Sequence, residues 1–372
     1  MQLRFQVNPP LFLPLAAASF APLHQKRVTI YDIAKKVGVS HTAVALALRN
    51  HHRISEKRRE QILQTAAKMG YVPDPLLSAL ASYRSQVRPA TLQNTIAWIN
   101  HWEQPEKLRG AHREFDAYWQ GARQAAQRFG YRLEEIRWEP EFSARRFEQI
   151  LLTRAIRGVL IPPHNVAPDW GDFDWSKFSV IRFGLSVTSP DSHLVTADQH
   201  RAVVMALKKI SSYGYQRIGM VVAEHLDRNV GGNFSGGFYA AQKLYKVPGI
   251  SSLLLSEVRD YQQRPAKAKE LLRRWLLKTK PDAVLTADAN VCHIIRELGY
   301  RIPQDIAVAG TGIDVPVDAG IDQHSEAIGR MAVEMLVSQI NLNERGEPSD
   351  PARILIESRW RDGLSLPPLK KA

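Results

Sequence analysis

The sequence is poor in cysteine. Its one cysteine, Cys292, has no partner within the chain, so a disulfide-stapled secreted scaffold is excluded. A zinc site built on cysteine pairs is excluded for the same reason. A chain of this composition belongs in a reducing compartment, and we expect a cytoplasmic protein.

Long apolar runs are also missing. A bilayer-spanning helix needs roughly 18 apolar residues, and even Leu11 to Ala21 is shorter and is interrupted by Pro14. We therefore expect no membrane partner. Residues 1–26, with Arg4 before this apolar run, faintly resemble a signal peptide. Because prolines break the run, we expect a disordered leader instead.

Catalytic motifs are absent from the sequence. It has no Gly-x-Ser-x-Gly elbow, no Walker phosphate loop and no His-Glu-x-x-His motif. The glycine-rich segment Gly231–Gly237 lacks the lysine of a phosphate loop, and we interpret it as a flexible loop at a cleft mouth. We expect no enzyme activity, no catalytic residue, no cofactor and no metal.

Acidic residues are outnumbered. The chain has 50 Lys and Arg against 37 Asp and Glu, which leaves a formal net charge of +13. Such an excess points to a polyanion, either nucleic acid or an acidic membrane surface. The segment Lys26–Arg88 holds twelve basic and four acidic residues. This concentration favours a separate basic module that binds nucleic acid.

The basic segment has a helical pattern. A first helix is expected over Ile30 to Val37, with Thr29 as its cap and Gly38 in the turn after it. Ser40 and Ser55 are expected to cap two further helices, the last of which ends at Gly70. The core positions expected in these two helices are Val44, Ala47, Leu48, Ile62, Leu63, Ala66, Ala67 and Met69. The pattern indicates a helix-turn-helix.

Three motifs follow one another along this segment. They are Val28-Thr-Ile-Tyr-Asp-Ile-Ala-Lys-Lys-Val-Gly-Val-Ser40, Arg53-Ile-Ser55 and Met69-Gly-Tyr-Val-Pro73. In this order and spacing they resemble the DNA-binding headpiece of the lactose repressor (LacI/GalR) family. The resemblance implies that the second helix lies in the major groove of double-stranded operator DNA.

Residue-by-residue placement on the family gives the candidates for DNA contact. They are Thr29, Ile30, Tyr31, Ser40, His41, Thr42, Ala45, Leu46, Arg49, Arg53, Ser55 and Arg58. The family usually has Ser-Arg where this chain has Ala45-Leu46, so a bidentate Arg contact with guanine is missing there. Apolar contact with thymine methyl groups is expected instead, and the operator is expected to differ from the family's common one.

A short helix is expected after Pro73, with Pro75 in its first turn. The resemblance implies a hinge helix that enters the minor groove as a pair, with Leu80 as the residue wedged between base steps. Leu77 stands where the family more often has a small residue, and it is also expected at the DNA.

From about Gln93 short apolar runs alternate with helix-length segments such as Phe115–Phe129 and Ala266–Thr279. This alternation indicates doubly wound parallel sheets, and the number of strands favours two α/β lobes with a ligand cleft between them. The expected strands are Ile96–Ile99, Arg132–Ile136, Gly158–Ile161, Val180–Phe183, Ile218–Val222, Ser252–Leu255, Ala283–Thr286 and Ile306–Ala309.

Further motifs in this part resemble the family's effector domain, which is itself similar to periplasmic sugar-binding proteins. They include Val195-Thr-Ala-Asp198, Tyr213-Gly-Tyr-Gln-Arg-Ile-Gly219 and Ile302-Pro-Gln-Asp-Ile-Ala-Val308. The resemblance implies a small-molecule effector, such as a sugar or a sugar derivative. Polar positions of the family's pocket are replaced, since Phe234 stands where an Arg is common and Gly310-Thr-Gly312 where Gly-Phe-Asp is common. The candidates that remain for the effector are His101, Trp102, Phe183, Asp198, Phe234 and Asp288.

The leading hypothesis is a homodimeric, sequence-specific transcriptional regulator, a repressor that binds a palindromic operator and responds to a ligand. The alternative is a soluble sugar-binding receptor or enzyme of the same two-lobed fold, with no function on DNA. The expected domains are a leader (1–26), a helix-turn-helix domain (27–72), a hinge helix and linker (73–90), a two-lobed effector-binding and dimerisation domain (91–365) and a tail (366–372).

Overall fold

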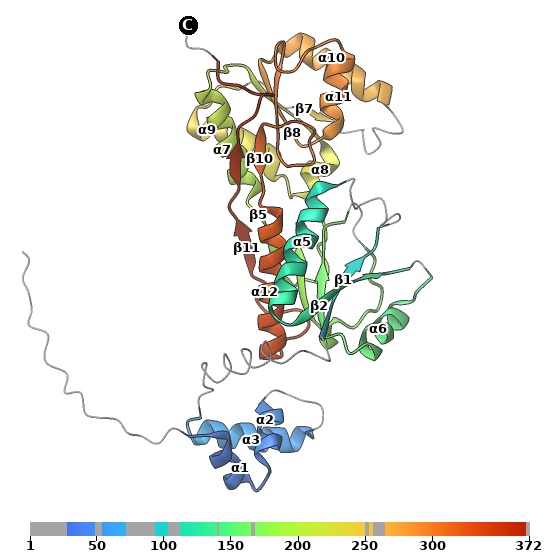
Figure 1. The fold of residues 1–372 in the computed structure, drawn as a ribbon, viewed down its shortest axis with the longest axis vertical. Coiled ribbons are helices and arrows are strands. Elements are labelled where there is room, and N and C mark those ends of the chain that lie inside the picture. The colour runs from blue at the N-terminus through green and yellow to red at the C-terminus, as the bar shows by residue number, and fades with distance from the viewer. Residues whose placement is uncertain are drawn as a thin grey trace, which may run out of the picture. The chain divides into compact units, whose positions relative to one another are not determined.

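The structure is a computed structural model that describes residues 28–48, 54–71, 94–102, 112–139, 141–164, 168–249, 253–255 and 265–369. The chain divides into two compact units, residues 1–75 and 76–372 (Figure 1). The first unit is helical in its described part, and the second contains all the described strands.

The first unit contains the three predicted helices, α1 (Ile30–Val37), α2 (His41–Leu48) and α3 (Glu56–Lys68). We call its described part, residues 28–48 and 54–71, the headpiece. Ile33, Val44 and Ile62, one from each helix, are fully buried and form the centre of its core. Leu63 was expected in this core but is 43% exposed, and Ala67 is exposed as well, because both lie on the outer side of α3.

Side chains fix where these helices begin. Thr29 and Asp32 form a capping box at α1, in which the Asp32 carboxylate accepts the Thr29 N–H at 2.8 Å. Ser40 Oγ accepts the N–H of Ala43 at 3.1 Å at the start of α2. Gly38 has φ 74°, and this left-handed conformation ends α1 as predicted. Ser55 precedes α3, but its side chain makes no capping hydrogen bond, contrary to the prediction.

The first lobe of the second unit is built on a six-stranded parallel sheet in the order β11-β5-β4-β3-β1-β2. Its strands are β1 (Asn94–Asn100), β2 (Tyr131–Arg137), β3 (Gly158–Ile161), β4 (Ser179–Phe183), β5 (His193–Ala197) and β11 (Arg353–Ile356). Helices α5 (Arg113–Arg128) and α12 (Ser325–Leu342) cover one face, and α6 (Ala144–Thr153) covers the other. The short 3-10 helix η2 (Trp175–Lys177) precedes β4. Strands β3 and β4 are buried along their whole length, as expected for a sheet covered on both faces.

The second lobe has a sheet in the order β12-β10-β9-β8-β6-β7, which is parallel except for β12 against β10. Its strands are β6 (Ile218–Ala223), β7 (Leu253–Leu255), β8 (Ala283–Thr286), β9 (Ala307–Gly310), β10 (Gly320–Asp322) and β12 (Arg359–Arg361). Helices α7 (Gln199–Ser212) and α9 (Asn233–Tyr245) cover one face, while α10 (Pro265–Thr279) and α11 (Ala289–Glu297) cover the other. Helix α8 (Glu224–Asn229) follows β6 directly. The predicted class, a helical unit followed by two α/β lobes, is confirmed.

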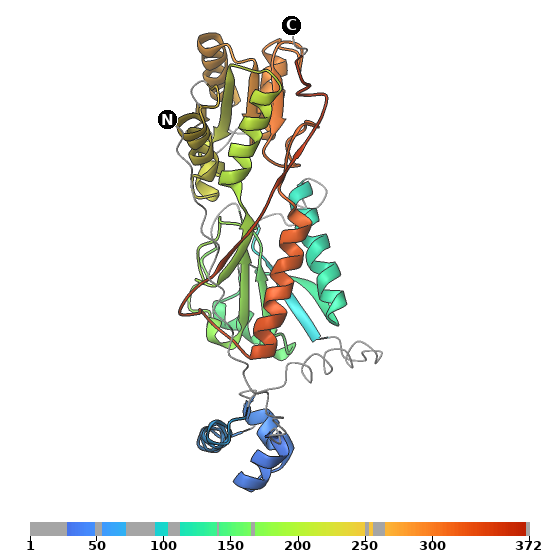
Figure 2. The ribbon, with the colours of Figure 1, turned by 90° about the vertical axis from the view of Figure 1, so that its left-hand side faces the viewer.

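The chain passes between the lobes three times, after β5, after β10 and after β11 (Figure 2). The β10 crossing leads into α12, which lies beside α5 along the first lobe. Two glycines allow these helices to touch. A Cβ at Gly121 would lie 1.9 Å from the Glu326 carbonyl oxygen, and one at Gly329 would lie 2.1 Å from that of Tyr118. Close backbone contact therefore holds α12 against α5.

Some details differ from the sequence-based expectation. The segment Gly231–Gly237 is not a flexible loop, because only Gly231 and Gly232 form a turn and α9 begins at Asn233. The pattern also missed β5, β10, β11 and β12. Leu366, where a tail was expected, is fully buried in the second lobe, so the chain stays packed on that lobe beyond this position.

Candidate functional site

An aromatic pair lies on the exposed surface of the headpiece. The Tyr31 side chain is 63% exposed, and its ring lies 4.8 Å from that of His41, with an interplanar angle of 30°. His41 and Thr42 are exposed in the first turn of α2. The first turn of α2 and Tyr31 of α1 thus present an imidazole, a hydroxyl and a phenol close together, and all three groups can hydrogen-bond to base edges or phosphates.

The other predicted DNA contacts have different positions. Ile30 and Leu46 are partly buried, and Ile30 packs against the headpiece core. The side chains of Thr29 and Ser40 make hydrogen bonds as helix caps. Arg58 is exposed and donates to the Gln61 side chain at 3.0 Å. Outside the described residues lie Arg49, Arg53, Leu77, Leu80 and the side chain of Ala45.

A cleft of about 210 Å³ lies between the two lobes of the second unit. Most of its lining follows the carboxyl ends of parallel strands, including Trp102 after β1, His164 after β3, Ser186 after β4, Ala287 after β8 and Thr311 after β9. In open α/β sheets this is the edge at which ligands bind. The cleft is therefore the candidate ligand site of the second unit.

Aromatic side chains form the apolar part of the cleft. Trp102 is fixed by a hydrogen bond from its Nε1 to the Pro163 carbonyl at 3.2 Å, and it packs edge-on against Phe115 at 5.2 Å. Tyr118 and the buried Phe234 complete this part. Flat apolar faces with a few polar groups between them are typical of small-molecule sites.

One polar group in the cleft has no partner in the described structure. Gln199, at the start of α7, is only 5% exposed, and its Nε2 donates to Thr196 Oγ1 at 3.2 Å. Gln199 lines the cleft, and its Oε1 is buried and accepts no hydrogen bond from the described residues. Since a buried acceptor without a partner loses about 1–3 kcal/mol, Gln199 is a ready contact for a ligand donor.

The ionisable side chains of the described cleft lining include the carboxyl groups of Glu114 and Asp314 and the imidazole of His164. Among the described lining residues there is no Lys or Arg. Burial lowers the pKa of His164 to about 4, so this imidazole is neutral near pH 7. Burial raises the pKa of Glu114, although hydrogen bonds from the Ser325 hydroxyl and the Ile313 N–H act in the opposite direction. Such a lining offers no positive charge to an anionic ligand.

The structure brings together only two of the predicted effector contacts, Trp102 and Phe234. Phe183 is fully buried and packs against Trp98 in the core, so it does not line the cleft. Asp198 and Asp288 cap their own helices, accepting the N–H groups of Arg201 and Asn290 at 2.9 Å. The His101 ring lies 6.2 Å from that of Trp138, outside the cleft lining. Gln199, Glu114 and Tyr118 were not predicted.

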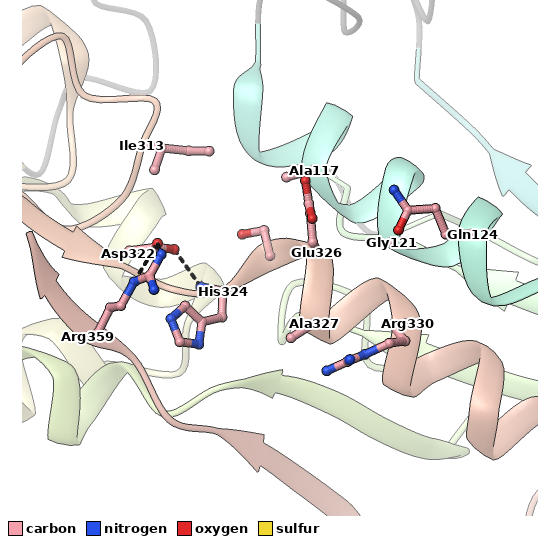
Figure 3. A pocket seen from close by; sticks show the side chains of 11 residues that line it. Ala117, Gly121, Gln124, Ile313, Asp322, His324, Glu326, Ala327, Arg330 and Arg359 are labelled. Carbon is pink, nitrogen blue, oxygen red and sulfur yellow. Dashed lines mark hydrogen bonds and ion pairs between the residues drawn. The ribbon is translucent and has the colours of Figure 1, made fainter.

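A second cavity, of about 470 Å³, lies beside the lobe crossings and is lined mainly by α5 and the first turns of α12 (Figure 3). Two of its charged groups are paired, because Asp322 accepts a hydrogen bond from the Arg359 guanidinium at 2.8 Å. Asp322 also accepts the backbone N–H of His324 at 2.9 Å. Its lining comes mostly from helix faces, not from strand ends. The cleft is the stronger candidate for ligand binding.

Two properties of the described residues bear on alternative functions. No described helix is both long enough and apolar enough to cross a membrane. The described part of the chain also holds no group of His, Cys, Asp and Glu side chains arranged to bind a metal ion.

Comparison with known proteins matches both units. Residues 29–74 match the family described as "Bacterial regulatory proteins, lacI family", and residues 208–366 match the "Periplasmic binding protein-like domain". The chain is 23% identical to the HTH-type transcriptional regulator DegA of Bacillus subtilis (76% of this chain, 81% of DegA). It is 22% identical to the HTH-type transcriptional repressor PurR of Haemophilus influenzae (86% of this chain, 93% of PurR).

Solved structures share the fold. The transcriptional regulator CelR in complex with cellobiose superposes with a TM-score of 0.54 at 20% identity, covering 91% of this chain and 100% of CelR. The lac repressor dimer bound to operator and an anti-inducer gives a TM-score of 0.50 at 17% identity, covering 92% and 99%. A helix-turn-helix unit that matches the lacI family, joined to a two-lobed domain, makes this chain a LacI-family DNA-binding transcriptional regulator with an effector-binding domain.

Proposed function

We propose that the protein acts as a homodimeric repressor in the cytoplasm, that it binds a palindromic operator, and that a small uncharged polar molecule in the cleft controls it. Support for a dimer comes from the lac repressor, which has this fold and was solved as a dimer on its operator. One headpiece reads few base pairs, and two-fold pairing doubles the site that is read.

In this proposal the start of α2 enters the major groove. The exposed groups of Tyr31, His41 and Thr42 contact base edges and neighbouring phosphates. Arg58, exposed on α3, contacts the backbone. The basic excess of this segment makes binding strongly dependent on salt.

The observation that carries the effector proposal is the unpartnered Oε1 of Gln199 in the cleft. This oxygen can accept a hydrogen bond from a hydroxyl or N–H group of a ligand. The faces of Trp102 and Phe234 suit a flat or ring-shaped molecule. Related structures hold cellobiose in CelR and ribose in a regulator from Enterococcus faecium. A cleft of about 210 Å³ suits a ligand nearer in size to a monosaccharide or a nucleobase than to a disaccharide.

The described lining of the cleft holds no Lys or Arg, which disfavours a negatively charged ligand. A phosphate or carboxylate group would enter next to Glu114 and Asp314, and the described lining holds no Lys or Arg to pair with it. The ligand is therefore uncharged.

The test is calorimetric titration of the full chain with ribose, glucose, adenine and hypoxanthine, each beside its phosphorylated form. One uncharged compound should bind, and its phosphorylated form should bind at least tenfold more weakly. In Gln199→Ala this affinity should fall at least about tenfold, as expected for loss of a buried hydrogen bond. Gln124→Ala, in the second cavity, is the matched control and should bind normally. Preferred binding of the phosphorylated form, or equal losses in both variants, would contradict the proposal.

A further inference from the structure

The side chain of Glu114 joins the two lobes. It belongs to the first turn of α5 in the first lobe. Its Oε1 accepts the N–H of Ile313, in the loop after β9 of the second lobe, at 2.9 Å. Its Oε2 accepts the hydroxyl of Ser325, where the chain crosses from β10 into α12. Both carboxylate oxygens are therefore used in contacts with the second lobe or its crossing segment.

The second lobe also contacts the start of α5 through the side chain of Asp314. Asp314 Oδ1 accepts the backbone N–H of Glu114 at 3.1 Å, and its Oδ2 lies 3.5 Å from His112 Nδ1. His112 is the N-cap residue of α5, but its side chain makes no capping hydrogen bond. Asp314 thus does from the opposite lobe what an N-cap side chain does within a helix. We call these reciprocal contacts of Glu114 and Asp314 the carboxylate latch.

A glycine makes room for this latch. A Cβ at Gly312 would lie 2.6 Å from Glu114 Oε1, closer than a real Cβ atom approaches. The Glu114 carboxylate therefore fills the space that a side chain at 312 would take at the edge of the cleft. The polar group between the lobes at this place is thus supplied by α5.

We propose that Glu114 is an internal bridging group of the effector cleft, which closes the two lobes on each other without a ligand and leaves room only for a small molecule. This inference rests on the proposed function, because it takes the cleft as the effector site. The carboxylate latch and the residues that it contacts line both cavities. Glu114, Gly312 and Asp314 lie in the cleft, and Ile313 and Ser325 lie in the second cavity. An effector then acts on lobes that are already closed.

The energetics favour a closed resting state. An effector that brings two lobes together has to supply the bonds that join them. In this chain the bonds to Ile313 and Ser325 involve a carboxylate, and hydrogen bonds to charged groups are the stronger kind. Loss of both should shift the ratio of closed to open molecules at least about tenfold toward the open form.

The test is a distance measurement between the lobes by double electron–electron resonance on the full chain, with neither DNA nor ligand. Spin labels go on Thr188→Cys in the first lobe and Ala289→Cys in the second, both exposed positions near strand ends. Cys292 is fully buried and stays unlabelled. The parent should give one short distance distribution. Glu114→Ala should add a longer component, and Glu326→Ala, an exposed carboxylate beside Ser325, should not.

A second variant keeps the test decisive if Glu114→Ala does not fold. Gly312→Ala displaces the carboxylate without deleting it and should give the same longer component. Distributions identical to the parent in the folded variants would overturn the latch. Since the measurement uses neither DNA nor effector, it stands even if the assignment of the effector fails.

Discussion

The rings of Tyr31 in α1 and His41 in α2 lie against each other, with centroids 4.8 Å apart and their planes tilted by 30°. Tyr31 is the second residue of α1, and His41 is the first residue of α2, the helix expected in the major groove. The pair holds the imidazole in a defined orientation without burying it, since both side chains are exposed.

The first prediction concerns this pair. Tyr31→Ala should weaken binding to the selected operator about tenfold, because it removes one polar contact and releases His41. The melting temperature should stay unchanged, since the ring is 63% exposed. Fluorescence anisotropy with operator and with random duplex measures the effect. Tyr239→Ala, 53% exposed in the second unit, is the control. An equal loss on both duplexes would reduce Tyr31 to a nonspecific contact.

The capping box at α1 sets the second prediction. Thr29→Ala removes the acceptor for the Asp32 N–H and the donor to the Asp32 carboxylate. The headpiece should lose about 1 kcal/mol of unfolding free energy. Thermal unfolding followed by circular dichroism tests this, with Gln64→Ala on the exposed side of α3 as control. Equal stability of the two variants would show that the box contributes nothing.

Contact between α5 and α12 sets the third prediction. Gly329→Ala would place a Cβ 2.1 Å from a backbone oxygen and force the helices apart, at a cost of about 3 kcal/mol. Gly236→Ala, in α9, meets only the His200 ring at 3.7 Å and should be neutral or gain about 0.5–1 kcal/mol. Urea unfolding of both variants gives the comparison. A tolerated Gly329→Ala would mean that α12 is not tightly held.

The His112–Asp314 contact sets a pH dependence. The hydrogen bond that His112 donates to the Asp314 carboxylate raises the pKa of His112, and the charges of Asp314 and Asp116 add to this while burial opposes it. A raised folded pKa gives stability that is fully present below the unfolded pKa of about 6.5 and is lost as pH rises through the folded value. The wild type should therefore be more stable than His112→Gln at about pH 5.5, and the stabilities of the two proteins should become equal by about pH 8.5.

The expected size of this difference is small. His112 is 48% exposed and Asp314 is 31% exposed in their side chains, so solvent screens the pair and about 0.5 kcal/mol is the scale. Differential scanning calorimetry of the two proteins over this range measures it. The carboxyl of Glu114 also has a raised pKa, but it is present in both proteins and cancels in the comparison. A difference that grows with pH would contradict the assignment.

The headpiece was predictable because its signals are local. Thr29, Gly38 and Ser40 mark helix ends through bonds to residues within a few positions, and the apolar spacing marks the core. Two of the strands that the pattern missed, β10 and β11, have weak local signals. β10 has three residues, and β11 alternates between exposed and partly buried residues at the edge of its sheet. They form because the neighbouring strands already offer an edge to pair with.

The cleft was less predictable because position after a strand does not fix where a side chain points. Asp198 and Asp288 both follow buried strands, yet their carboxylates turn to the N–H groups of their own helices. Gln199, one residue further on, faces the cleft instead. Glu114 and Ile313 are 199 residues apart, so no motif links them and only the closed fold brings them together.

The central claim, a dimeric regulator that reads DNA through α2, is tested most directly by selecting duplexes from a random library with the full chain. The account predicts enrichment of a two-fold symmetric sequence, with an affinity that falls steeply as salt rises. It also predicts that His41→Ala changes the bases preferred in each half-site. Recovery of non-palindromic or salt-insensitive binders, or the same preference in His41→Ala, would contradict it.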